Sequence, residues 1–188
     1  MEQQRSTWFD PTGIGMLAVA LSVIPFSLFL LGVLPLQTMP AIMALLLTTG
    51  ILSLIVGLIS LARGDFGGIP MLLFGLLFMI QPAVSFMMNP GPPNQVTGIV
   101  NIIGGVILIP VAIVLGRMSW IPCVFIGLVG IGVILAGCAI LGAPPILGLL
   151  GAILVLLFGV HMLYTGIGLI LAQGFGRPIL PMGKPMIK

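Results

Sequence analysis

Charged side chains are scarce in this sequence. Its 188 residues include only three acids and six bases, and 60% of the residues are hydrophobic. A water-soluble domain of this size needs far more polar surface than these side chains supply. The shortage excludes a soluble globular protein and predicts an integral membrane protein, in keeping with a mean hydropathy of +1.37.

Residues that carry metal or enzyme chemistry are also few. The two cysteines, Cys123 and Cys138, fall on one predicted helix about 22 Å apart along its axis, which excludes a disulfide between them. The sequence has no Cys/His cluster of the kind that binds a metal. It also has no Ser-His-Asp set, carboxylate pair or phosphate-binding loop that would indicate an enzyme. We therefore expect no catalytic residues, no metal, no cofactor and no nucleic-acid partner.

Long apolar runs dominate what remains. Each run is about long enough for a helix to cross roughly 30 Å of hydrocarbon, and Pro/Gly-rich or polar breaks separate them. The expected fold class is an all-α polytopic membrane protein, a single six-helix domain over residues 1–188 with a short leader (1–12) and a tail (174–188). The six predicted spans are 14–36, 41–62, 68–88, 97–115, 121–141 and 146–172.

The few charges all fall on one side of these six spans. The opposite loops carry none, and a count of five or seven spans would scatter the bases over both sides. Because positive residues stay in the cytoplasm, we expect both termini to be cytoplasmic. The expected location is the cell inner (cytoplasmic) membrane, which the chain crosses several times. The bases are Arg5, Arg63, Arg117, Arg177, Lys184 and Lys188, and the acids are Glu2, Asp10 and Asp65.

Glycines recur at regular spacing within the spans and predict close helix packing, because small residues let backbones approach where lipid gives no hydrophobic drive for association. These glycines are Gly50, Gly57 and Gly64 in the second span, Gly98 and Gly105 in the fourth, and Gly127, Gly130 and Gly137 in the fifth.

The first span begins with Asp10, Pro11, Thr12, Gly13, Ile14, Gly15 and Met16. Asp favours a helix N-cap and Pro the first helical position, so one interpretation is simply a helix start. The other is functional: the backbone donors and the positive dipole end of this helix face an anion at a pore entrance.

Two polar residues inside the spans are candidate site residues. His161 is the one group there with a pKa near neutrality, and Tyr164 and Gly168 follow it at helical spacing, which places the three on one face. It either lines a pathway and handles protons or is a neutral imidazole hydrogen-bonded inside the bundle. Asn101 is costly to bury and should face a neighbouring helix or a wet cavity.

Three stretches, in order along the chain, resemble the acetate/succinate permease (AceTr) family. Residues 10–16 resemble the family's Asn-Pro-Ala-Pro-Leu-Gly-Leu. Residues 57–67, with Gly57-Leu58 and Arg63-Gly64-Asp65-Phe66-Gly67, resemble its turn between helices two and three. Residues 175–183, Phe-Gly-Arg-Pro-Ile-Leu-Pro-Met-Gly, are similar to its closing Phe-Gly-Arg-Thr-Val-Leu-Pro-Ile-Gly. The resemblance extends over essentially the whole chain.

This resemblance implies six helices around a pore, a homohexamer, and passage of acetate and related short carboxylates with protons. It implies substrate contacts at Asp10, Pro11, Thr12, Gly13, Ile14 and Gly15, where Asp10 replaces the family's Asn. It also implies a hydrophobic constriction at Val19, Phe74 and Val129, with Leu128 as the alternative to Val129. Because both valines are smaller than the family residues, we expect a wider gate that tolerates larger acids.

We therefore predict a proton-linked channel or permease for acetate and related short carboxylates, in the lipid bilayer. Asn101, His161 and Tyr164 complete the expected substrate-binding set. One alternative is a passive channel for a neutral solute such as urea, an amide or ammonia, which the lack of charge in the spans favours. The other is a sensor or assembly subunit that transports nothing, for which the short loops offer little binding surface.

Overall fold

The structure, a computed structural model, describes residues 10–91, 93–181 and 183–184, and these residues form helices joined by short turns with no strand among them. The elements in chain order are α1 (Thr12–Leu30), η1 (Leu36–Thr38), α2 (Met39–Ala62), α3 (Gly68–Leu73), η2 (Phe74–Ile80), α4 (Gln81–Met88), α5 (Gln95–Leu115), α6 (Trp120–Ile140) and α7 (Pro145–Phe175).

Six helical segments of the described chain are long and apolar enough to cross a membrane, which confirms the six predicted spans. The third span is α3, η2 and α4 in continuous succession. The first span is shorter than predicted, because Gly32 adopts a φ of +75°. Its N–H donates to the carbonyl of Phe29, and the N–H of Val33 donates to that of Leu28, a glycine-based helix stop.

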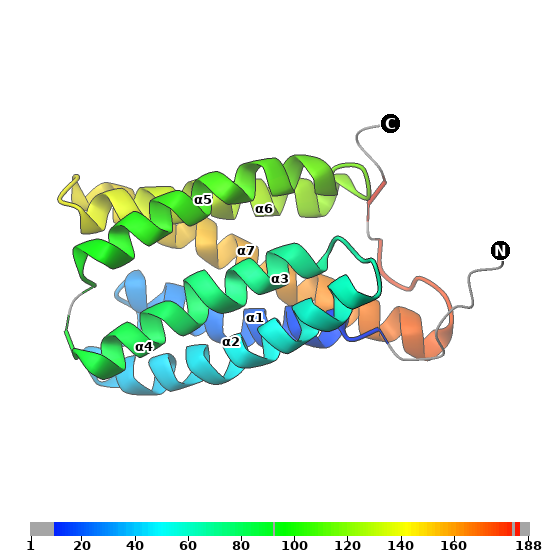
Figure 1. Cartoon of the computed structure of the whole chain (residues 1–188), viewed down its shortest axis with the longest axis horizontal. Helices are drawn as coiled ribbons and strands as arrows, with labels where there is room; N and C mark the ends of the chain where they lie inside the picture. The colour runs from blue at the N-terminus through cyan, green and yellow to red at the C-terminus, as the bar shows by residue number, and fades with distance from the viewer. Residues whose placement is uncertain (1–9, 92, 182, 185–188) are drawn as a thin grey trace.

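The spans form a ring in which each packs on its neighbours in the chain, and α7 closes the ring by packing along α1. Figure 1 shows α5 and α6 side by side, with α1 and α2 across the bundle from them. The contact between α5 and the third span is the least extensive in the ring. This arrangement gives every span one side toward the centre and one toward the surroundings.

Glycines bring α5 and α6 together as predicted. A Cβ added at Gly105 would lie 2.5 Å from the carbonyl oxygen of Gly130, and one at Gly137 would lie 2.6 Å from that of Gly98. A Cβ cannot approach a backbone atom so closely, so these two helices pack through backbone contact. Gly64 departs from the prediction, because it has open space around it and a φ of +75°, which places it in a turn.

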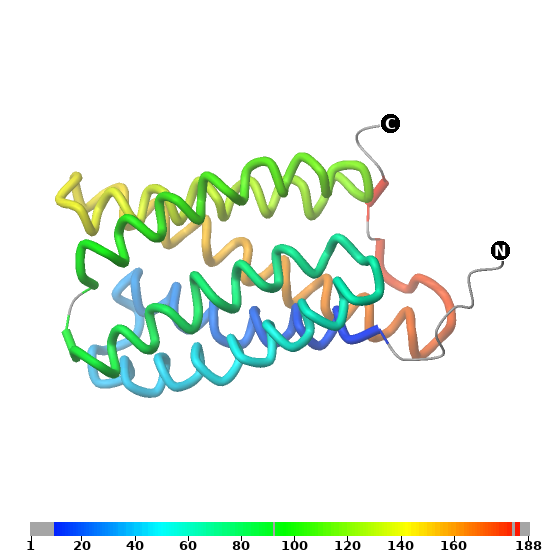
Figure 2. Tube along the Cα trace, in the orientation of Figure 1, coloured from blue at the N-terminus to red at the C-terminus, as the bar shows by residue number. Residues whose placement is uncertain are grey.

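The turns and helix ends gather at two opposite ends of the bundle (Figure 2), and these ends differ in charge. The start of α1, the end of α7 and the turns 63–67 and 116–119 form what we call the terminal face. The segments 31–38, 89–91, 93–94 and 141–144 form the opposite end, the loop face. All charged side chains in the described part of the chain, from Asp10 to Lys184, belong to the terminal face. Its assignment to the cytoplasm stays a prediction.

Candidate functional site

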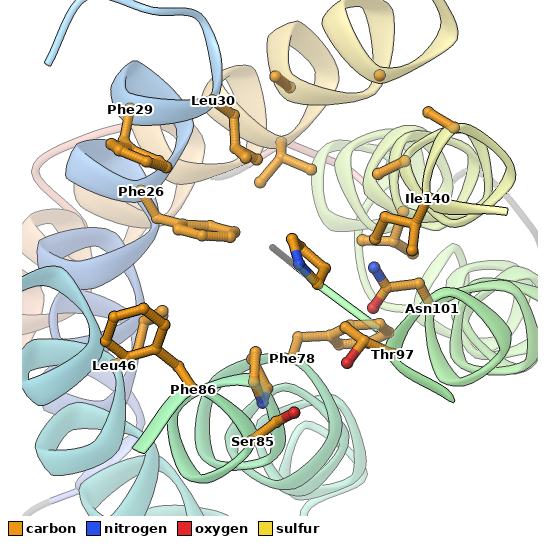
Figure 3. A pocket seen from close by; sticks show the side chains of 18 of the residues that line it. Phe26, Phe29, Leu30, Leu46, Phe78, Ser85, Phe86, Thr97, Asn101 and Ile140 are labelled. Carbon is orange, nitrogen blue, oxygen red and sulfur yellow. The ribbon is translucent and has the colours of Figure 1, made fainter. Parts of the chain in front are cut away.

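A cavity of about 560 Å³ lies inside the ring and reaches the loop face. The second half of α1, the first halves of α2, α5 and α7, and the ends of α4 and α6 contribute to its walls. Four phenylalanines form much of the apolar wall: Phe26, Phe29, Phe78 and Phe86. Figure 3 shows Phe26 extending from α1 into the cavity.

The cavity ends about halfway through the bundle at three buried side chains. Phe74 on η2, Val129 on α6 and Phe158 on α7 line it there, and each is almost fully inaccessible to solvent. The rings of Phe74 and Phe158 stack with centroids 4.6 Å apart. We call these three residues the floor; they separate the cavity from the packed half of the bundle below.

The floor contains two of the residues expected in the constriction. Phe74 and Val129 line the cavity, whereas Val19 is fully buried but does not, and the alternative Leu128 is half-buried and also lies away from it. Phe158 was not predicted. An aromatic residue in the sixth span carries no sequence signal of its own, because a phenylalanine is equally at home facing lipid.

The helix that carries Phe74 is locally widened. Residues Phe74–Ile80 form a π-helix, and the N–H of Gln81 donates to the carbonyl of Leu76 five residues back. Pro82 follows and has no N–H to donate, so the regular α-helical ladder is interrupted next to it. Phe74 and Phe78 both line the cavity, and their ring centroids are 5.5 Å apart.

The polar part of the cavity wall lies on α4, on α5 and at the adjoining caps of these two helices. Its side chains are Ser85, Asn89, Asn94, Thr97 and Asn101, and Figure 3 shows the Asn101 amide facing the interior. Thr97 donates its hydroxyl to Asn94 Oδ1 at 3.2 Å and accepts from Gln81 Nε2 at 3.4 Å. Asn101 has no hydrogen bond to any described side chain or backbone group. Asn101 thus lines the cavity, and its Cβ also packs beside Gly137 of α6, so both expected surroundings, a cavity and a neighbouring helix, are present.

The start of α1 is a helix cap. Asp10 Oδ1 accepts hydrogen bonds from the Thr12 N–H at 3.0 Å and from the Thr12 hydroxyl at 2.6 Å. The carbonyl of Asp10 accepts from Gln173 Nε2 of α7 at 3.0 Å. The carboxylate is therefore held in the helix start, but one residue earlier than predicted, because Pro11 and not Asp10 occupies the N-cap position.

The rest of this motif is used for packing. A Cβ at Gly13 would lie 3.1 Å from Ile170, and one at Gly15 would lie 2.7 Å from Val56, so neighbouring helices cover both glycines. Ile14 is 43% exposed and points out of the ring. Of residues 10–15, Asp10 lines the small polar cavity described below, and the other five line neither that cavity nor the large one. Helix packing therefore accounts for both glycines, and the expectation that this backbone faces a solute stays a prediction.

His161 lies in the packed half of the bundle. It is buried, stacks on Phe125 with ring centroids 4.3 Å apart and planes 8° apart, and has Thr165 Oγ1 3.2 Å from Nδ1. It lines neither cavity. This environment is that of an imidazole hydrogen-bonded inside the bundle, the second of the two predicted alternatives.

Tyr164 does not share the buried face of His161. It is 37% exposed, and its hydroxyl donates to the carbonyl of Pro181 at 3.0 Å. Three residues turn a helix by about 300°, so Tyr164 lies at the edge of the face on which His161 is buried. At this edge it contacts the C-terminal segment. The same segment reaches α6, where Lys184 O accepts from the Trp120 N–H at 3.0 Å. Tyr164 is therefore a contact for the tail.

A second, small cavity of about 220 Å³ lies at the terminal face and is polar. Asp10, Ser60, Arg63 and Asp65 line it, and Thr12 Oγ1 lies 3.4 Å from Ser60 Oγ. Asp65 Oδ1 accepts from the Gly67 N–H at 2.9 Å. Charged side chains thus line the small cavity at this end of the bundle, whereas the described lining of the large cavity has none.

A ring of six apolar helices that encloses a cavity and keeps its charges at one end is a polytopic α-helical membrane protein. Its structure is similar to that of the bacterial acetate channel SatP, with a TM-score of 0.83 and 20% sequence identity, over 94% of this chain and 100% of that chain. This likeness confirms the expected six-span fold. The sequence matches no protein-family model and no curated protein.

Proposed function

We propose that the protein is a membrane channel or permease for acetate and related short-chain carboxylates. The observation that carries this proposal is the cavity that runs from the loop face to the floor, inside a ring with the fold of an acetate channel. That neighbour is a channel, which also supports the expectation that this chain is not an enzyme.

The pathway follows the axis of the ring. It starts in the large cavity, crosses the floor of Phe74, Val129 and Phe158, and leaves through the polar cavity that includes Asp10 and Ser60. The floor is closed, so passage requires these side chains to move. Val19, buried below the floor, is the next constriction on this route.

Transport in this pathway is linked to protons. An ionised carboxylate gives up its hydration when it enters an apolar space, at a large cost in free energy without a compensating cation. The described lining of the large cavity holds no such cation. A carboxylic acid that crosses in its protonated form avoids the cost and carries a proton with it.

The membrane is the inner membrane, and the assembly implied by the resemblance is a homohexamer.

A passive channel for neutral solutes is the second candidate, because the same uncharged wall and the Asn101 amide suit urea or an amide. A flux assay distinguishes the carboxylate transporter from the neutral-solute channel. It measures the entry of labelled acetate and of labelled urea into liposomes that contain the purified protein. Acetate flux well above that of empty liposomes, with urea at the level of empty liposomes, supports the proposal. The reverse result refutes it.

A pair of variants on α6 tests the route. Val129→Phe fills the floor, whereas Val124→Phe adds the same ring at a position 39% exposed on the outside of the same helix. We expect Val129→Phe to lower acetate flux about tenfold, equal to roughly 1.4 kcal/mol in the barrier, and Val124→Phe to leave it unchanged. Equal flux in both variants would place the pathway elsewhere.

A further inference from the structure

The large cavity has far more room than acetate needs. Pockets of roughly 300 to 1,000 Å³ ordinarily hold drug-sized molecules, and this one measures about 560 Å³. We propose that the cavity is a binding site for an apolar monocarboxylic acid of roughly six to ten carbons, taken up in its protonated form. The inference rests on the proposed function, because it names the solute class for which this part of the pathway is built.

The wall fits the body of such an acid. The rings of Phe26, Phe29, Phe78 and Phe86 surround the space, and Phe74 and Phe158 close it below. Aromatic rings pack well against a phenyl group or an extended alkyl chain. Each additional buried methylene should raise affinity roughly fourfold, which favours larger acids over acetate.

Asn101 fits the head group. Its carboxamide is half-buried, faces the cavity and has no hydrogen bond within the described chain. A carboxamide offers both an acceptor and a donor, and these match the O–H and C=O of a protonated carboxylic acid. The Thr97 hydroxyl is already engaged by Asn94 and Gln81. Asn101 is therefore the one half-buried carboxamide in the described cavity lining whose donor and acceptor are both free. Asn89 also lines the cavity, but it is exposed at the loop face.

The charge of the wall selects the protonated form. No ionisable side chain is present in the described lining of the cavity, and the polar cavity of Asp10 and Arg63 lies at the other end of the bundle. A carboxylate would be desolvated here without a cation. An uncharged amide of the same shape should bind as well as the protonated acid, which provides a probe that is neutral at every pH.

Titration calorimetry on the purified protein in lipid nanodiscs, with empty nanodiscs subtracted for partitioning, tests this assignment. We expect phenylacetamide to bind at least tenfold more tightly than acetamide. Phenylacetic acid should compete with it at about pH 5 and not at about pH 8, since a carboxyl group of pKa near 4.3 is almost fully ionised there. Asn101→Leu should weaken phenylacetamide binding about tenfold. Thr48→Val, away from the cavity and bonded only to its own helix, should not.

Asn101→Ser is the second variant if Asn101→Leu fails to fold, with a smaller loss expected. Equal affinity for phenylacetamide and acetamide, or an unchanged affinity in both Asn101 variants, overturns the assignment. Acetate flux on the same preparation keeps the two proposals apart. Flux without phenylacetamide binding overturns the cavity assignment and leaves the transport function, whereas binding without flux overturns the transport function alone.

Discussion

Phe158 of α7 stacks on Phe74 of η2, with ring centroids 4.6 Å apart and ring planes 18° apart. The two rings come from the sixth and third spans, which are not neighbours in the ring of helices. Together with Val129 they close the cavity halfway through the bundle. The stack is thus a bridge across the proposed pathway.

Loosening this stack should widen the route. Phe158→Leu removes one ring and keeps an apolar side chain, so we expect the ratio of butyrate to acetate flux to rise about threefold or more, with a stability loss of about 1 to 2 kcal/mol. Liposome flux of both labelled acids measures it. Phe175→Leu, at the exposed end of α7, is the matched control. A ratio unchanged from wild type would show that Phe158 does not limit passage.

Two substitutions of Asp10 separate the two effects of its carboxylate, the hydrogen bond at the helix start and the negative charge at the terminal face. Asp10→Asn keeps the oxygen that accepts from the Thr12 N–H, so stability should hold, while loss of the negative charge at the terminal face should raise acetate flux at low salt by about twofold. Salt should diminish the gain. Asp10→Ala should instead cost about 1 kcal/mol through the lost cap.

Thermal unfolding and flux at two salt concentrations report on these variants. Asp65→Asn is the matched variant for charge, because Asp65 lines the same small cavity and its Oδ1 makes an equivalent bond to the Gly67 N–H. It should raise acetate flux at low salt in the same direction as Asp10→Asn. A lower flux in Asp10→Asn at low salt would contradict the expected repulsion.

His161 should contribute to packing and not to proton transfer. It lies between Phe125 and Thr165 and lines neither cavity. We expect His161→Gln to leave the pH dependence of acetate flux unchanged and to lower stability by about 1 kcal/mol, the usual worth of one hydrogen bond. Flux across pH 5 to 8 measures it, and a displaced or flattened profile would restore the proton-handling alternative.

Close approach of α5 and α6 can be tested with a pair of alanines. Gly105→Ala would place a Cβ 2.5 Å from the carbonyl oxygen of Gly130, whereas Gly127→Ala would meet nothing nearer than 3.9 Å. Thermal unfolding should therefore show a loss of about 1 to 3 kcal/mol for the first variant and little change for the second. Similar stability in both would mean that the two helices are not held by backbone contact.

Part of the candidate site could be predicted from the sequence. Phe74, Val129 and Asn101 were predicted and all line the cavity. Ile14 and Tyr164 were also predicted, but both are exposed. Helical spacing shows which residues are neighbours on one face of a helix, but residues three or four apart still differ in rotation about the helix axis. It also does not show toward which neighbouring helix that face points.

The sequence by itself determined the membrane character, the six spans, the end that carries charge and several glycine contacts. These follow from the composition of each segment, because a long apolar run must cross the bilayer and a glycine permits close approach wherever it occurs. Only the tertiary structure decided which side of each helix faces the cavity. The helices are apolar all round, and lipid and protein core are equally apolar surroundings. The rotation of each helix is therefore set by packing, which joins Phe158 to Phe74 and leaves Asn101 facing an open, uncharged space.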